Sequence, residues 1–307
     1  FGPASTASGT YTVAATDTTN DLDHTSIALG TGSALVDGGG NAIQSWTPAT
    51  VLSTNKDIQI DGNRPTIMKI RSTQAAGYYK VDDVIPIQIY FSEAVTTTAA
   101  NIITATLKTG STNADATVTY GALSNETLGT ASYTVRTGDY NSSLTLNSIA
   151  ISIGQNINDQ AGNSMIDTSI PGGKNIHDEI VDIFVDDVVT ADLGYAITMV
   201  STGGNVFAAK YNDTNTGVDF TVAIQSDASL VGGTIQIKAK IAPNGWTSIG
   251  DPHTITDANK TAGSATMSVL SAPVEALIGF ATDAEIKIIA TVTDVAGNTT
   301  DWAESTN

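Results

Sequence analysis

Three short loops carry the residues with the clearest capacity to bind a metal ion. Each loop has the form Asp-x-x-Gly-Asn, and the three run from Asp37 to Asn41, from Asp159 to Asn163 and from Asp294 to Asn298. Carboxylate, amide and backbone carbonyl oxygens are the ligands of calcium, which takes roughly six to eight of them. The same pattern also makes a good turn, because Asp bonds back to nearby backbone and Gly accepts a positive φ. The loops therefore predict either calcium sites or plain turns.

Acidic linkers follow the first two loops, at residues 56–65 (KDIQIDGNRP) and 178–187 (DEIVDIFVDD). Because a loop at one end of a β-sandwich meets the linker to its neighbour, we expect calcium at two domain junctions. The ligands predicted for the first junction are Asp37, Asn41, Asp61 and Glu93. The ligands predicted for the second junction are Asp159, Asn163, Asp186 and Asp187, to which Asp213 and Asp219 could add from the third domain.

Other residue types give weaker indications of chemistry. His24, His177 and His253 are isolated, and no two have the i, i+4 spacing of metal ligands on one helix face. The chain has no cysteine, no Gly-x-Ser-x-Gly and no His-Glu-x-x-His. Acidic pairs abound, but a catalytic pair is not expected to recur with a repeat. The sequence therefore predicts that the chain is not an enzyme.

The three tryptophans supply the main alternative. Trp46, Trp246 and Trp302 could stack on a sugar if they lined one exposed face, although they fall in different segments. A carbohydrate-binding module of a secreted enzyme is therefore the alternative function, and the positions of the tryptophans distinguish it.

The loops belong to an internal repeat. Residues 10–42 and 132–164 both contain a Tyr-Thr-Val strand, a turn with Asp, a Ser-Ile-Ala strand and the closing loop, at an offset of 122 residues. Residues 288–298 form a weaker third copy of the closing part. Self-similarity at a fixed spacing is typical of an array of similar domains.

Period-two patterns predict the strands that must position these loops. Ile85, Ile87, Ile89 and Phe91 alternate with polar or exposed-type residues, and Pro86 places this strand at an edge or beside a bulge. In the last third of the chain the alternating apolar residues are Val218, Phe220, Val222, Ile224, Ile235, Ile237, Ile286, Ile288, Ala290 and Val292. Only Pro273 to Phe280 has a helix-like pattern.

Composition limits the class of protein and its partners. Only 14% of the 307 residues are charged, with a net charge of −18, and this surface repels nucleic acid and anionic membranes. No apolar run reaches the roughly eighteen residues of a membrane span, so we expect no membrane insertion. The chain starts at Phe1 without a signal peptide, and we interpret it as a processed or cut piece of a longer protein.

The linkers divide the chain into residues 1–62, 63–185 and 186–307. The first part is too short for the front strands that the second part has. Either it was cut within a domain, or a strand from a neighbouring molecule completes it.

Several segments resemble a known family. YYKVDDVIPIQIYFSEAV (residues 78–95) is similar to the opening of bacterial immunoglobulin-like repeats, with Val81-Asp82 in place of the usual Gly-Asp. Residues 12–29 and 134–151 resemble a mid-domain strand pair of these repeats, and residues 290–300 the closing strand of a related class. The resemblance implies large surface adhesins or surface-layer-type proteins, often with calcium between domains.

These observations together predict an all-β chain of tandem immunoglobulin-like β-sandwich domains, the first one incomplete. The expected function is extracellular and structural or adhesive: a stiff, calcium-stabilised array at the cell surface, in a surface layer, filament or adhesin stalk. The expected partners are further copies or neighbouring repeats of a longer chain, and a glycan or surface ligand is a further candidate.

Overall fold

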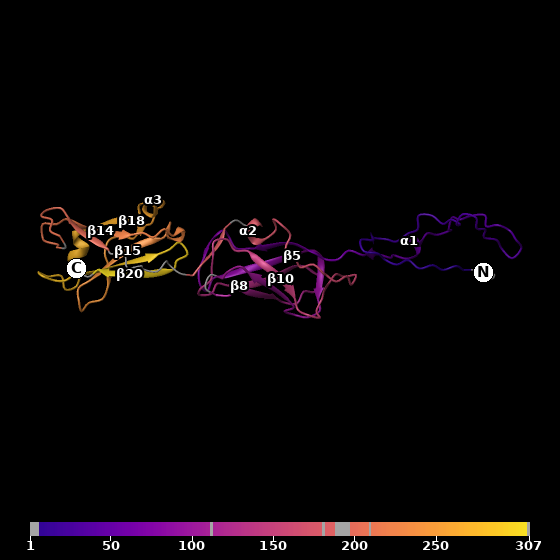
Figure 1. The fold of residues 1–307 in the computed structure, drawn as a ribbon, viewed down its shortest axis with the longest axis horizontal. Helices are drawn as coiled ribbons and strands as arrows, with labels where there is room; N and C mark the ends of the chain where they lie inside the picture. The colour runs from indigo at the N-terminus through magenta and orange to yellow at the C-terminus, as the bar shows by residue number, and fades with distance from the viewer. Residues whose placement is uncertain (1–5, 111–112, 180–181, 188–196, 209, 306–307) are drawn as a thin grey trace.

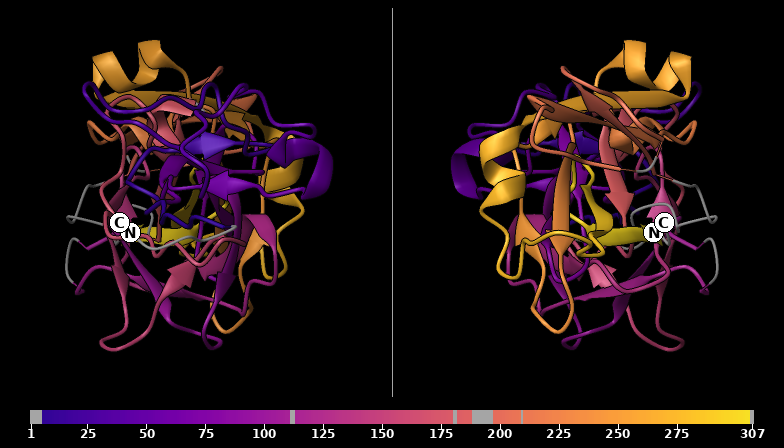
Figure 2. Two further views of the ribbon diagram at one scale, coloured as in Figure 1. Left: turned by 90° about the vertical axis from the view of Figure 1, so that its right-hand side faces the viewer. Right: turned by 90° about the vertical axis from the view of Figure 1, so that its left-hand side faces the viewer.

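The computed structural model describes residues 6–110, 113–179, 182–187, 197–208 and 210–305. They form an elongated, mostly β structure in which three regions follow one another along the long axis (Figure 1). Figure 2 looks along that axis, where the regions lie behind one another. We call them the N-terminal segment (residues 6–62), the central region (residues 63–187) and the C-terminal region (residues 197–305). The structure is mostly β with several antiparallel sheets, in agreement with the all-β class predicted from the sequence.

The central region contains two main sheets around one hydrophobic core. One sheet has the order β11-β5-β3 with β8 also paired to β5, and the other has the order β10-β6-β7. A smaller sheet, β4-β12-β9, includes a parallel pairing of β12 with β4. The elements are β3 (Ile67–Ser72), β4 (Gly77–Tyr79), β5 (Val84–Thr97), β6 (Ile103–Leu107), β7 (Thr117–Tyr120), β8 (Glu126–Thr134), β9 (Tyr140–Asn141), β10 (Leu146–Ile151), β11 (Ile157–Asn158), α2 (Ile176–Glu179) and β12 (Ile183–Asp186).

Strand β5 follows the predicted period-two pattern. Ile85, Ile87 and Ile89 are fully buried, as expected when one face of a strand points into a core. From Ile87 to Tyr90 the strand pairs with both β3 and β8, so it is not an edge strand there, whereas Ile85 and Pro86 pair with β8 alone. Its pairing with β3 ends at Ile87, so Pro86 lies just beyond β3, where its missing N–H interrupts no hydrogen bond to β3. An irregularity in the β5–β8 register also follows Tyr90.

The C-terminal region has a second, separate hydrophobic core. Its two sheets have the orders β13-β14-β18 and β16-β15-β19-β20, and β17 pairs with β15. The elements are β13 (Thr198–Thr202), β14 (Gly217–Ala223), the 3-10 helix η1 (Ala228–Leu230), β15 (Thr234–Lys240), β16 (Thr247–Ser248), β17 (His253–Thr254), α3 (Asp257–Ala262), β18 (Ser264–Leu270), α4 (Ser271–Glu275), β19 (Lys287–Thr293) and β20 (Thr299–Ser305). The helix-like pattern predicted from Pro273 to Phe280 overlaps α4 only at residues 273–275, and residues 276–280 are not helical. Helix α3 was not predicted.

The N-terminal segment is built differently. It contains β1 (Thr18–Thr19), which pairs with β2 (Ile60–Asp61), and the four-residue helix α1 (Leu52–Asn55). None of residues 6–62 is buried. The segment therefore has turns and short pairings but no hydrophobic core.

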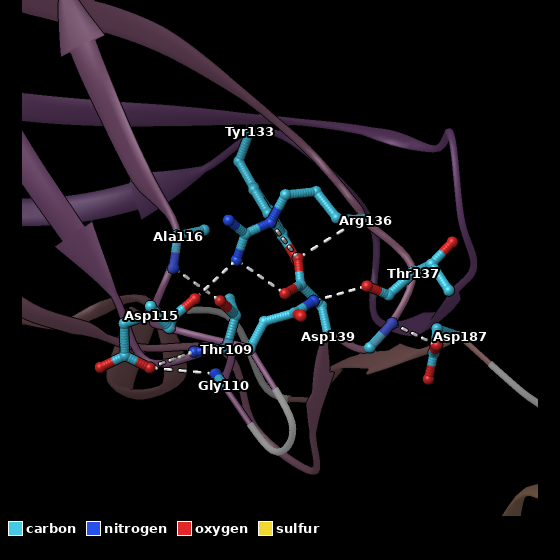
Figure 3. Close-up of polar contacts among 12 residues, drawn as sticks. Thr109, Gly110, Asp115, Ala116, Tyr133, Arg136, Thr137, Asp139 and Asp187 are labelled. Carbon is cyan, nitrogen blue, oxygen red and sulfur yellow. Dashed lines mark hydrogen bonds and ion pairs between the residues drawn. The ribbon is translucent and has the colours of Figure 1, made fainter.

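A polar cluster fastens the turn after β8 in the central region (Figure 3). The buried Asp139 carboxylate accepts hydrogen bonds from the Tyr133 hydroxyl at 2.8 Å and from the Arg136 guanidinium at 2.7 and 2.9 Å. Burial raises the pKa of Asp139, but the hydrogen bonds from Arg136 and Tyr133 outweigh it and the net pKa is lowered. Asp139 is thus held as a carboxylate where an unpaired charge would be costly.

No helix among the described residues is long and apolar enough to cross a membrane.

Candidate metal centre

The three Asp-x-x-Gly-Asn loops have the same geometry. Their glycines, Gly40, Gly162 and Gly297, have φ of 83°, 93° and 85°, a region that favours glycine. In each loop the aspartate N–H donates to the asparagine carbonyl, and the aspartate carboxylate accepts from the asparagine N–H and side-chain amide. The turn function anticipated from the sequence is therefore present in all three loops.

Two of these loops also form a hydrogen bond to a linker. The side-chain amide of Asn163 donates to the Asp61 carbonyl oxygen at 3.0 Å, and that of Asn298 donates to the Asp186 carbonyl oxygen at 3.0 Å. Asp61 and Asp186 occupy matching positions in the two linkers, after Ile-x-Ile and Ile-x-Val. Each loop therefore faces the linker that precedes its own region, and not the linker that follows it.

Three acidic side chains meet at the first of these contacts. Asp61 comes from β2, Glu93 from the far part of β5, and Asp159 from the loop after β11. One carboxylate oxygen of each lies within 4.8 Å of the others. Among the described residues this is the one group of three or more acidic, histidine or cysteine side chains with such spacing. The three oxygens are hard ligands of the kind that calcium prefers.

The electrostatics of this acidic cluster (Asp61, Glu93 and Asp159) are unfavourable without a cation. Burial raises the pKa of Glu93, and the nearby charges of Asp159 and Asp61 raise it further. Within the described part of the chain, none of the three carboxylates forms an ion pair with Lys, Arg or His. A divalent cation would remove the repulsion that the protein's own side chains leave uncompensated.

The cluster retains oxygen atoms that a cation could use. The two oxygens of Asp159 already accept hydrogen bonds from Asn163, and one oxygen of Asp61 accepts from the Asn63 N–H. A carboxylate has about four acceptor positions, so these bonds fix the orientation of the side chains without using all of them. Protein groups would supply only part of a calcium shell, and water would complete it.

The structure distributes the predicted ligands differently from the sequence analysis. Asp159 and Asn163, assigned to the second junction, lie at the first with Asp61 and Glu93. The exposed Asp37 and Asn41 bond within their own loop and do not join that group. The physical reason for this difference is the position of the loop Asp159–Asn163. It lies at the end of the central region where the chain enters from the first linker, and not at the end where the chain leaves.

Among the described residues, Asp186 and Asp187 at the second junction are not part of an acidic cluster like that of the first junction. Asp186 is buried and its carbonyl accepts from Asn298, while the Asp187 carboxylate accepts from the Gly138 N–H (Figure 3). The loop of Asp294 takes the place that the sequence analysis gave to the loop of Asp159. Lys80 Nζ also donates to the Gly297 carbonyl at 3.2 Å, so a cationic side chain of the central region contacts this loop directly. The signal that could have identified Asp294 and Asn298 was the third Asp-x-x-Gly-Asn motif, which lies in the region that follows the linker at residues 178–187.

The tryptophans do not form one exposed row. Trp302 is buried in the core of the C-terminal region, and Trp246 lies under Lys240, whose Nζ is 4.0 Å from the ring centroid. Trp46 belongs to the N-terminal segment, at the other end of the molecule (Figure 1). The alignment that sugar stacking would need is absent from these three residues.

Comparison with known proteins adds no relative. No protein-family model matches the chain, and no curated protein is similar to it.

Proposed function

We propose that this chain is an extracellular structural or adhesive protein, an array of immunoglobulin-like β-sandwich modules whose first junction is stiffened by calcium. The observation that carries the proposal is the repeated junction contact, in which a closing-loop asparagine binds the carbonyl of the preceding linker at 3.0 Å in two places. An array whose function is shape needs such repeated connections, whereas a catalytic protein does not.

The first junction has further contacts that restrain the linker. Arg64 Nη1 donates to the Ser164 carbonyl at 2.6 Å, next to the bond between Asn163 and Asp61. Pro65 follows, is buried, and has a fixed φ. The short linker between β2 and β3 is therefore attached to the central region at two points, which supports a stiff connection.

Calcium suits this junction because it binds the linker and the central region together. Asp61 belongs to the linker, whereas Glu93 and Asp159 belong to the central region. A cation shared by them would be released when the two parts separate. Oxygen sites of extracellular modules bind calcium with dissociation constants of about 0.1–1 mM.

The test is a calcium titration of thermal stability and of small-angle scattering. A ligand at ten times its dissociation constant stabilises the native state by about 1.4 kcal/mol. We therefore expect millimolar calcium to raise the melting temperature of the central region, and EDTA to lower it and to broaden the distribution of scattering dimensions.

Two matched variants locate the effect. Asp159→Asn removes a carboxylate from the acidic cluster, and Asp37→Asn makes the same change in the equivalent loop outside the cluster. The calcium response should be lost in the first variant and retained in the second. A wild-type protein that melts and scatters identically in calcium and in EDTA would contradict the calcium part of the proposal.

A further inference from the structure

The N-terminal segment repeats several pairings and hydrogen bonds of the second half of the central region. We call residues 63–125 the front half and residues 126–187 the back half. The bridge between Val36 and Ala42 matches the bridge between Asn158 and Ser164, 122 residues later. The pairing of Thr18 with Asp61 matches the pairing of Tyr140 with Asp186.

The agreement extends to single hydrogen bonds. Leu22 N–H donates to the Ile58 carbonyl as Leu144 N–H donates to the Ile183 carbonyl. The Tyr11 hydroxyl donates to Asp17 as the Tyr133 hydroxyl donates to Asp139. The N-terminal segment is therefore folded as a back half, and the residues that the structure describes place no front half beside it.

The side chains that face a core in the back half are exposed in the N-terminal segment. In the back half the exposed fractions are 2% for Tyr133, 1% for Val135, 6% for Ile149, 0% for Ile157 and 5% for Met165. Their equivalents are Tyr11 at 57%, Val13 at 44%, Ile27 at 47%, Leu35 at 50% and Ile43 at 41%. An apolar set of this size on one segment marks an interaction surface.

The central region shows what covers such a set. Strand β5 pairs with both β8 and β11, with Tyr133 opposite Ile85 and Ile157 opposite Thr97. Strand β6 pairs with β10, where Ile149 lies opposite Ala105. In the N-terminal segment the equivalents of β8, β10 and β11 are residues 6–12, 24–29 and 35–36, and each has an unpaired backbone edge.

We propose that the N-terminal segment is a docking surface for a polypeptide of the front-half type, which adds the missing strands by β-augmentation. The incoming polypeptide would contain one long strand with apolar residues at every second position, like β5, and a second strand like β6. The first would pair with residues 6–12 and 35–36, and the second with residues 24–29. This surface is separate from the acidic cluster and does not depend on calcium.

A second copy of this chain cannot cover the N-terminal segment by lending its front half without exposing its own back half. In the described part of the chain, two segments have the back-half arrangement, at 6–62 and 126–187, and one has the front-half arrangement, at 63–125. Any exchange between copies that completes one N-terminal segment leaves another back half open. The occupant is therefore a front half other than residues 63–125 of a second copy.

The experiment supplies a front half and measures amide hydrogen exchange. A copy of residues 63–125 is fused directly to residue 4 of the chain. Residue 4 is equivalent to residue 126 at the offset of 122 residues, so the fusion reproduces the natural connection between residues 125 and 126. We expect exchange in residues 6–12, 24–29 and 35–36 to slow by at least about 100-fold. The equivalent amides in 128–134, 146–151 and 157–158 give the reference protection in the same sample. All measurements are made in EDTA, so failure of the calcium site would not alter the result.

The control carries Ile85→Ser, Ile87→Ser and Ile89→Ser in the added copy only, which keeps the length but removes the apolar face. It should leave exchange in the N-terminal segment fast. A second arm adds residues 63–125 as a separate polypeptide, and protection there would show that no covalent connection is needed. Fast exchange in both the fusion and the mixture would overturn the proposal. Protection of the unmodified chain that rises with its own concentration would also overturn it, because a second copy would then be the occupant.

Discussion

Residues 6–62 and the back half at 126–187 contain the same turns in different surroundings. The loops Asp37–Asn41 and Asp159–Asn163 share their backbone and side-chain hydrogen bonds, yet only the second is attached to a core. Turns form from contacts between residues close in sequence, so they need no neighbour. Extended strands need partners from elsewhere in the chain, and the N-terminal segment has only two-residue strands.

The difference shows that the turns of the back half form from local contacts, whereas its strands are paired and buried only where a front half is present. The front half brings β5, the strand that joins β3, β8 and β11 into one sheet. Where it is present, Tyr133 and Ile157 are buried. Where no equivalent is present, Tyr11 and Leu35 are exposed.

The largest effect should come from truncating equivalent apolar residues. Ile157→Ala leaves a cavity in the core of the central region and should cost about 2–5 kcal/mol of unfolding free energy. Leu35→Ala at the equivalent position removes half-exposed surface and should change stability by less than about 0.5 kcal/mol. The unfolding free energy of each variant is measured by urea denaturation, in which amide exchange of peptides from β5 reports the unfolding of the central region. Equal losses would break the comparison, because the N-terminal segment would then share a core.

The next effect concerns the polar cluster of Tyr133, Arg136 and Asp139. Asp139→Asn removes a buried charge that accepts from both partners, and should cost about 1.5–3 kcal/mol because hydrogen bonds to a charged group are lost. Asp17→Asn changes the equivalent carboxylate, which accepts from Tyr11 and from the Ala14 N–H in a solvent-accessible turn. It should leave the melting of the central region unchanged, as followed by circular dichroism. A similar loss from both variants would show that the cluster stabilises the turn without burial.

The smallest effect is a pH dependence of stability at the first junction. Because the folded-state pKa of Glu93 is raised above its ordinary value of 4.5, its contribution to stability is fully present below that value. The contribution is lost as the pH rises through the higher folded-state pKa. Without calcium, the central region should therefore gain stability on mild acidification from pH 7.

Glu93→Gln should remove this part of the pH profile and raise the melting temperature at pH 7 in EDTA. Glu126→Gln, an exposed position on β8, is the matched control and should keep the wild-type profile. Melting curves between pH 4 and pH 8 measure the difference. A Glu93→Gln profile that overlays that of the wild type would remove the electrostatic argument for the acidic cluster.

Much of the fold follows from local patterns in the sequence. The alternation of Ile85, Ile87 and Ile89 identified a buried strand face, and the Asp-x-x-Gly-Asn spacing identified three turns. Helix α3 was missed because Asp257–Ala262 has no apolar stripe. Its signal is the capping box between Thr256 and Asn259, followed by Gly263 at the C-terminus.

Calcium binding at the first junction stays a prediction. Asp61 and Glu93, which were assigned to one junction, do lie in one acidic cluster, but its third member is Asp159 and not Asp37. The loops are nearly identical in sequence, and nothing in their spacing tells whether a loop faces the linker before it or the linker after it. That direction depends on how the sheets stack, and it becomes visible only in the bond from Asn163 to Asp61.

The attachment of the linker at Asp61 and Arg64 has a consequence for reach. A freely jointed string of domains extends in proportion to about the square root of its number of links. When each linker is hydrogen-bonded to the domain that follows it, the angle between two neighbouring domains is restricted. In the proposed array, the end-to-end distance would then grow more steeply than the square root of the number of domains.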